Sequence, residues 1–89
     1  MIPEEVKRRF ENADGRHERA WAGANQTFRK ILSGEAKLVL IAENTKPPEI
    51  VIPLVNEAKH KNIPIHYGTK EEIGKIAKCP RYAAAACLV

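Results

Sequence analysis

A segment of the chain, Gly-Ala-Asn-Gln-Thr-Phe-Arg-Lys at residues 23–30, has the residue types to bind an anion. The start of a helix presents unpaired N–H groups and a partial positive charge, which both favour an anionic ligand. Asn25 is a favoured N-cap residue, and Gly23 lets another backbone or a nucleotide come close. Arg29 follows Asn25 by four residues, so both side chains are expected on one outward stripe. The pattern favours nucleic acid as the ligand, although an ordinary capped amphipathic helix would show the same residues.

Cysteine and histidine, the residue types that most often bind metals, form no recognisable pattern in this sequence. Cys79 and Cys87 lack metal-ligand spacing and are expected to be reduced thiols packed beside the core. His17, His60 and His66 are scattered, and none lies near a second pair of ligands. We therefore predict no metal site and no cofactor.

The composition indicates one small basic domain. The chain has 89 residues, of which 44% are hydrophobic, enough for one compact core of marginal stability. Fifteen Lys and Arg against eleven Asp and Glu give a net charge of +4, which favours a polyanionic partner. No apolar run is long enough to span a bilayer, and the acidic start of the chain is the reverse of a secretory signal. The expected location is cytoplasmic, with no membrane partner.

Hydrophobic spacing predicts the elements of the first third of the chain. Ile2, Val6 and Phe10 recur every four residues, which predicts a short amphipathic helix that ends before Asp14-Gly15. Residues 19–22 are predicted to form a short strand. A second helix is expected over residues 26–33, directly after the Asn25 cap.

Prolines mark the expected elements of the middle of the chain. Residues 37–42 form a nearly continuous apolar run, typical of a buried strand. Pro48 is expected to open a third helix, in which Pro53 kinks or loosens the first turns and Asn62 marks the end. Residues 63–67 are predicted to form another strand.

The last part of the chain begins with a clear helix start. Thr69 and Glu72 have the spacing of a capping box for a fourth helix over residues 70–78. Residues 83–89 stay open between a helix, which alanine prefers, and a strand, which the alternating order of elements requires. The alternation predicts an α/β domain in which helices cover both faces of a sheet.

Three loops of this domain are expected to meet at one end of the sheet, the usual place for a ligand. Each loop brings at least one basic or amide side chain. They are residues 23–25, 44–48 and 78–82.

Two stretches of the sequence resemble the kink-turn RNA-binding family. The stretches are GANQTFRKILSGEAKLVLIAENTKPPEI, from Gly23, and NIPIHYGTKEEIGKIA, from Asn62. The family includes archaeal large-subunit ribosomal proteins of the "seven-Ae" and "thirty-e" type and core proteins of box C/D and H/ACA ribonucleoproteins. The shared motifs are Gly-x-Asn before a helix, an apolar strand ending in Ile-Ala, a Pro-Pro helix start and a Lys-Glu-Glu-Ile-Gly helix. The match covers about Trp21 to Val89. Residues 1–89 are expected to form one domain, in which residues 1–16 are an N-terminal helix and loop and residues 17–89 are the family core.

The resemblance implies a three-layer α-β-α sandwich with a small mixed sheet of about four strands. It also implies binding of a sharply bent RNA with tandem sheared G·A pairs, in which Asn25 reads a guanine edge. Gln26 takes the position of a family glutamate, and Arg29 that of a lysine. Ile50 stands where an apolar residue contacts an extruded nucleotide, and Lys70 where a lysine contacts phosphate. The RNA-binding residues expected from the segment and the resemblance are Gly23, Ala24, Asn25, Gln26, Arg29, Lys30, Lys46, Ile50, Lys70, Arg81 and Tyr82.

The sequence departs from the family pattern at several positions. Lys46 stands where an acidic residue is common, and Ser33 replaces an arginine present in several members. Residues 78–82 replace a more apolar loop that helps set RNA preference. These departures leave open whether the native RNA is ribosomal, a guide RNA or the RNA of ribonuclease P. The role of the basic residues 7–9 is open as well, between RNA, a protein partner and solvent.

The expected function is non-catalytic recognition of kink-turn RNA by a component of the large ribosomal subunit or another ribonucleoprotein. Other proteins of the particle are the expected partners, and the free chain is expected to be a monomer. The alternative is a protein-interaction module on the same fold, against which Asn25, Arg29 and the basic charge argue. A third hypothesis is a small enzyme with Glu43, Glu49 and His66 as acid–base candidates, but their spacing matches no nucleophile or metal arrangement.

Overall fold

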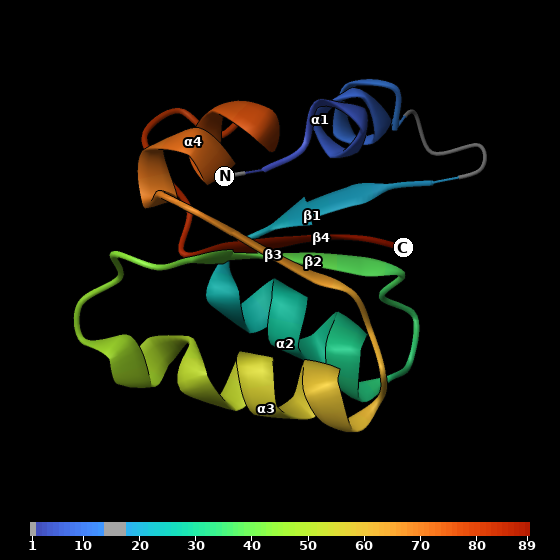
Figure 1. Cartoon of the computed structure of the whole chain (residues 1–89), viewed down its shortest axis with the longest axis vertical. Coiled ribbons are helices and arrows are strands. Elements are labelled where there is room, and N and C mark those ends of the chain that lie inside the picture. Colours follow the sequence, from blue (N-terminus) through green and yellow to red (C-terminus); the bar gives the residue numbers. More distant parts are fainter. Residues whose placement is uncertain (1, 14–17) are drawn as a thin grey trace.

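The computed structural model describes residues 2–13 and 18–89, and helices and strands alternate along most of this part of the chain (Figure 1). None of the helices described is long and apolar enough to cross a membrane. The elements are α1 (Glu4–Glu11), β1 (Ala20–Ala22), α2 (Ala24–Leu32), β2 (Leu38–Ala42), the 3₁₀ helix η1 (Pro48–Ile50), α3 (Ile52–His60), β3 (Ile65–Gly68), α4 (Lys70–Ile76) and β4 (Ala85–Leu88).

The strands described form a mixed sheet in the order β1-β4-β2-β3. Strand β2 is parallel to β3, whereas β4 is antiparallel to both β1 and β2. Strands β1, β2 and β3 therefore run in one direction and β4 runs in the other. Their last residues, Ala22, Ala42 and Gly68, lie at the same end of the sheet as Ala85, the first residue of β4. We call this end the carboxyl end of the sheet.

Strand β2 explains why the sheet is covered on both faces. All of its residues are buried, and successive side chains point to opposite faces. Leu38, Leu40 and Ala42 join the core that contains residues of α1 and α4, whereas Val39 and Ile41 join the core under α2 and α3. Figure 1 shows α1 and α4 on one face of the sheet and α2 and α3 on the other. The expected three-layer α-β-α sandwich is confirmed.

Helix α1 follows the predicted pattern. Pro3 is its N-cap residue, and Val6 and Phe10 are buried against the sheet. Arg9 forms an ion pair with Glu18, which connects α1 to the segment that leads into β1. The helix ends at Glu11, and the predicted stop at residues 14–15 lies outside the residues that the structure describes.

The third predicted helix is divided into two pieces. Its first turns form η1, and α3 begins after Val51 with Pro53 in its first turn. Proline is tolerated there because the N–H that it lacks would have no intrahelical acceptor. The predicted loosening by Pro53 is thus confirmed as a change from 3₁₀ to α geometry. Asn62 has a φ of 58° directly after this helix, in agreement with its predicted role as a terminator.

The last segment of the chain is a strand. Strand β4 pairs with both β1 and β2 and is buried along its whole length. The pairing of β4 with β1 and β2 thus outweighs the helix preference of the alanines in β4. Cys87 lies in this strand, and burial raises the pKa of its thiol to about 11. Cys79 is a half-buried free thiol.

Candidate nucleic-acid interface

Helix α2 begins at the carboxyl end of the sheet, and its start is set by Gly23. The Gly23 N–H donates to the Ala85 carbonyl at 2.8 Å, and the Gly23 carbonyl accepts from the Thr27 N–H at 3.0 Å. Gly23 has a φ of 100°, which glycine adopts without a steric penalty. The prediction of Asn25 as the N-cap was therefore wrong: Gly23 is the N-cap, and α2 covers Ala24–Leu32 rather than residues 26–33.

The start of α2 is left open by the protein. Among the residues described, no side chain caps this helix, and its first turn contains no acidic residue. The N–H groups of residues 24–26 have no acceptor within the helix and carry the positive end of its dipole. Asn25, Gln26 and Arg29 are exposed beside these groups, while Ile31 is fully buried and anchors the helix. Asn25 and Arg29 are thus both exposed on an anchored helix, as their spacing predicts.

Two of the three polar loops meet at the carboxyl end of the sheet, as predicted. The third, residues 78–82, reaches this end only where it leads into β4, because Lys78 lines a hollow with Arg19 and Ala20 at the other end of β1. The Ala42 N–H donates to the Ala84 carbonyl at 2.8 Å, which places the end of β2 beside the start of β4. The Glu43 N–H donates to the Gly68 carbonyl at 2.9 Å, which brings the end of β3 to the same place. The bond from Gly23 to Ala85 completes the group by adding the start of α2.

Asn44 joins the loop after β2 to the start of α4, and it was not among the predicted site residues. Its Oδ1 accepts from the Lys70 N–H at 2.8 Å, and its Nδ2 donates to Glu71 Oε1 at 3.2 Å. These bonds hold the loop after β2 against the start of α4. An asparagine in the loop after a strand is a common turn residue, and the sequence carries no stronger signal for Asn44.

Lys70 and Tyr82 lie together at this end of the sheet. The Lys70 Nζ is 4.8 Å from the centroid of the Tyr82 ring, within the range of a cation–π interaction. Tyr82 is 57% exposed, and Lys70 is half-buried. The loop that carries Tyr82 also carries Arg81, whose side chain is exposed.

Lys30 has partners within the protein. Its Nζ lies 2.9 Å from Glu35 Oε2 and 4.8 Å from the centroid of the Trp21 ring. The hydrogen bond from Lys30 lowers the pKa of the Glu35 carboxyl. A phosphate contact by Lys30, as the sequence predicts, would have to compete with these two interactions.

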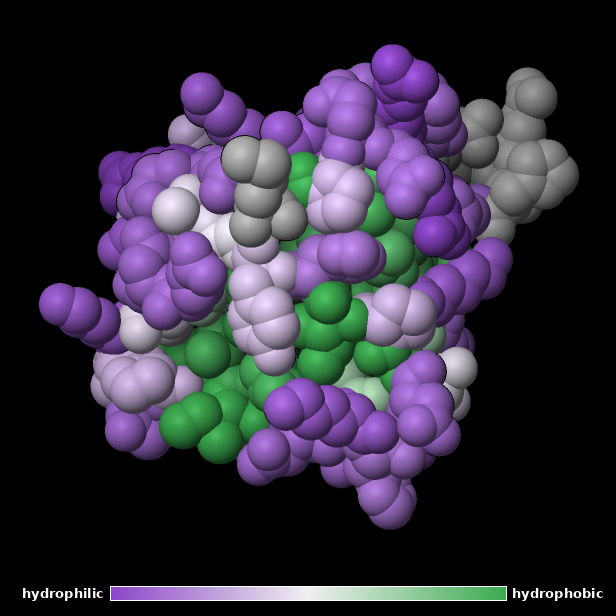
Figure 2. All heavy atoms as spheres, viewed as in Figure 1, coloured by the Kyte–Doolittle hydropathy of each residue, from purple (hydrophilic) through white to green (hydrophobic). Residues whose placement is uncertain are grey.

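The remaining predicted residues lie in the connection between β2 and α3. Lys46 is exposed, and Ile50 is 41% exposed. Figure 2 shows an apolar area over the start of α3, where Ile52 is also exposed. Lys46, like Arg29 and Arg81, has no ion-pair partner among the described residues. These cations are available to an anionic ligand.

The structure does not bring together the residues considered as acid–base catalysts. Glu43 and Glu49 are exposed after β2, His66 is half-buried in β3, and no described hydrogen bond or ion pair joins them to one another. Within residues 2–13 and 18–89, no group of three or more His, Cys, Asp or Glu side chains could hold a metal ion.

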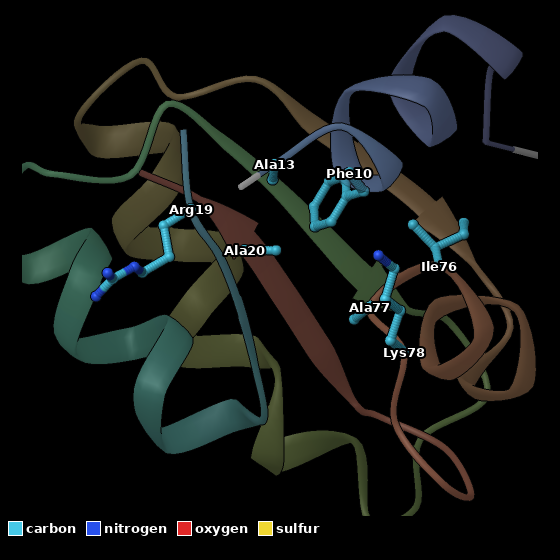
Figure 3. Close-up of a pocket in the computed structure, with 7 residues that line it drawn as sticks. All are labelled: Phe10, Ala13, Arg19, Ala20, Ile76, Ala77 and Lys78. Carbon is cyan, nitrogen blue, oxygen red and sulfur yellow. The ribbon is translucent and has the colours of Figure 1, made fainter. Parts of the chain in front are cut away.

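Two hollows lie between α1 and α4, away from the start of α2. The first, of about 330 Å³, has Phe10, Ala20 and Ile76 in its wall, and Figure 3 shows that Arg19 points away from the other side chains. Ala20 is the first residue of β1, so this hollow lies at the opposite end of that strand from the carboxyl end. The second, of about 510 Å³, is lined by Ile76 and by acidic and basic side chains together: Lys7, Glu11, Glu72, Lys75 and Lys78. Its mixed charge does not complement a polyanion.

Comparisons with known proteins agree with this architecture. The chain matches the family described as ribosomal protein L7Ae/L30e/S12e/Gadd45 over residues 6–89. Among solved structures it is similar to the Giardia lamblia 15.5kD RNA binding protein, with a TM-score of 0.75 and 26% sequence identity. That similarity covers 98% of this chain and 76% of the Giardia chain. The family match begins within α1, so it extends beyond the stretches on which the resemblance was based.

Proposed function

The chain belongs to the ribosomal protein L7Ae/L30e/S12e/Gadd45 family, and we propose that it is a non-catalytic protein that recognises and stabilises kink-turn RNA. The observation that carries this proposal is the open start of α2, with Asn25 and Arg29 exposed beside unpaired N–H groups. The similarity to a protein named as RNA-binding supports it.

In this proposal, Asn25, Gln26 and Arg29 read base edges. An amide both donates and accepts hydrogen bonds, so it can pair with the edges of guanine and adenine in sheared G·A pairs. The guanidinium of Arg29 offers a planar fork that suits two acceptors on one base or phosphate. These residues would contribute the discrimination between RNA sequences.

The other cations would position the RNA backbone. They are Lys46 and Arg81, on two loops near the carboxyl end of the sheet, and Lys70, at the start of α4. In a bent RNA the phosphates are crowded, and these cations would neutralise them. Such contacts release counterions, so the affinity should fall as the salt concentration rises. Because free kink-turn RNA exchanges between extended and bent forms, a protein that binds only the bent form shifts the population toward it.

This mechanism requires no covalent chemistry. We place the chain in a ribosome or another ribonucleoprotein particle of the cytoplasm, with the other proteins of that particle as neighbours. The free chain is proposed to be a monomer.

The test compares two RNAs that differ only at the G·A pairs. One is a kink-turn RNA, and the other is a copy in which the G·A pairs are replaced by Watson–Crick pairs. The chain should bind the kink-turn RNA about fivefold to about 100-fold more tightly, the range expected for a good base contact. Fluorescence anisotropy titrations at several salt concentrations would measure both affinities.

The outcomes separate the competing functions. Equal affinity for both RNAs, with a steep dependence on salt, would mean only non-specific charge attraction and would overturn the proposal. Absence of binding to either RNA at low salt would favour the protein-interaction module.

A further inference from the structure

Helices α1 and α4 lie on the same face of the sheet and form a groove that the proposed function does not use (Figure 1). The two hollows between these helices share Ile76 and Lys78 in their walls, so they adjoin each other. We call the space that they form the α1–α4 groove. Its walls are Lys7, Phe10 and Glu11 on α1 and Glu72, Lys75 and Ile76 on α4.

The two walls of the groove repeat the same spacing of residue types. On α1 a lysine is followed by an apolar residue after three positions and by a glutamate after four. On α4 a glutamate is followed by a lysine after three positions and by an apolar residue after four. Residues with this spacing lie on one stripe of a helix. Two facing stripes of this kind form a groove in which a third helix can lie.

The floor of the groove is apolar. Phe10 is buried, and four partly buried apolar residues pack against the same core. Figure 3 shows that these side chains come together from α1, β1 and the end of α4. They are Ala13, Ala20, Ile76 and Ala77. Partly buried apolar surface favours a partner that covers it with apolar side chains, which a protein has and an RNA lacks.

The rim of the groove has a surplus of lysines. Lys7, Lys75 and Lys78 form no hydrogen bond or ion pair with any residue that the structure describes. Of the two glutamates, Glu72 already accepts the Thr69 N–H within the capping box at 3.1 Å. The three ammonium groups therefore favour carboxylates on a partner, while Glu11 and Glu72 oppose a dense chain of phosphates.

We propose that the α1–α4 groove binds an acidic amphipathic helix of a partner protein. Helix α1 has eight residues and is about 12 Å long, so the groove accepts two to three turns of such a helix. The apolar face of the bound helix covers the floor, and its carboxylates pair with the three lysines of the rim. This gives Lys7 a partner, whereas Arg9 already pairs with Glu18.

The inference goes beyond the proposed RNA binding and does not depend on it. The core beneath the groove contains residues of α1 and α4, whereas Ile31 of α2 belongs to the core on the other face of the sheet. A helix in the groove and an RNA at the start of α2 should therefore bind at the same time.

The test uses a synthetic peptide of about 11 residues, or three helical turns. Its leucines are spaced three and four residues apart, and glutamates flank them. A lactam bridge keeps the peptide helical, because a free helix of this length is unstable in water. The full chain should bind the fluorescein-labelled peptide saturably below about 1 mM. In NMR spectra of the chain, the backbone amides that shift should be those of residues 7–11 and 72–78.

Charge reversals and altered peptides separate the two parts of the proposed contact. Lys7→Glu and Lys75→Glu should each weaken peptide binding by about twofold to about fivefold, the range for an exposed ion pair. Lys59→Glu is the matched control, because Lys59 is an exposed lysine on α3, and it should leave the affinity unchanged. A peptide with serines in place of the leucines should bind more weakly, and so should one with lysines in place of the glutamates. Thermal unfolding would confirm that each variant is folded.

Several outcomes would overturn the proposal. They are absence of peptide binding below about 1 mM, amide shifts outside the groove, and equal binding of the serine peptide, which would mean charge attraction alone. Displacement of the peptide by kink-turn RNA, or a loss of RNA affinity in Lys7→Glu, would make the groove part of an RNA surface instead. If the chain binds no kink-turn RNA, only the proposed function fails, because the peptide titration uses the protein alone.

Discussion

Helices α2 and α4 begin at the same end of the sheet, but their starts are built in opposite ways. In α4 the Thr69 Oγ1 accepts from the Glu72 N–H, and Glu72 Oε1 accepts from the Thr69 N–H, both at 3.1 Å. Glu71 and Glu72 place two acidic residues in its first turn, and Asn44 accepts from the Lys70 N–H. In α2 none of the described side chains caps the helix, and the first turn has no acidic residue.

The difference separates a start that stabilises the fold from one that is available to a ligand. The capping box and Asn44 together satisfy the N–H groups of Thr69, Lys70 and Glu72, and the acidic residues balance the helix dipole, so α4 gains less from an added anion. The N–H groups at the start of α2 have no such partners, and the helix depends on buried Ile31 for its position. An anion at α2 would therefore add stabilisation that the protein alone lacks.

The largest expected effect is that of Asn25→Ala on RNA recognition. Because Asn25 makes no cap bond, its removal should leave the free energy of unfolding within about 0.5 kcal/mol of the wild-type value. The preference for kink-turn RNA over its Watson–Crick copy should fall by about 1–3 kcal/mol, the value of a good base contact. Titrations of both RNAs and urea unfolding measure the two quantities.

Asn56→Ala is the matched control, because Asn56 is an exposed asparagine on α3. It should change neither the preference between the RNAs nor the stability. Unchanged discrimination in Asn25→Ala would show that Asn25 does not read the RNA. A clear loss of stability in that variant would mean that the start of α2 depends on this side chain after all.

Thr69→Ala should show the opposite behaviour. Loss of the capping oxygen should lower the free energy of unfolding by about 1 kcal/mol, the usual cost of a removed N-cap. The preference between the two RNAs should stay unchanged, because the Thr69 side chain bonds within the start of α4. Thr69→Ser keeps the oxygen and should restore the stability in urea unfolding. If Thr69→Ala unfolded like the wild type, the capping box would not stabilise α4, and the contrast between the two helix starts would fail.

The same contrast explains which parts of the fold could be predicted from sequence. The capping box of α4 uses residues that are close in sequence, so their spacing was sufficient to predict it. The start of α2 is set by the hydrogen bond from Gly23 to Ala85, which are far apart in sequence. Local preference pointed to Asn25, and a tertiary contact placed the cap elsewhere. For the same reason, β4 could not be chosen over a helix before its pairing was known.

The candidate site shows a similar division. The outward direction of Asn25 and Arg29 followed from helical spacing, and the structure agrees. The partners of Lys30 could not be predicted, because Trp21 comes beside it only when β1 and α2 pack together. Asn44 was missed because its bonds exist only when the loop after β2 meets the start of α4. Spacing thus predicts which face of a helix a residue occupies, while its partners depend on the assembled sheet.

The smallest expected effects come from making the start of α2 resemble that of α4. Ala24→Asp places a carboxylate in the first turn of α2, where it should raise the free energy of unfolding by about 0.3–1 kcal/mol through the helix dipole. The same charge should repel RNA and weaken its binding by about twofold to fivefold, which corresponds to the same range of energy. Ala24→Asn, which has the same size without the charge, separates electrostatics from packing. Stability and affinity should therefore change in opposite directions in Ala24→Asp alone, as measured by urea unfolding and anisotropy. An unchanged affinity in this variant would place the RNA away from α2, because a phosphate close enough to use the open N–H groups must also experience the added carboxylate.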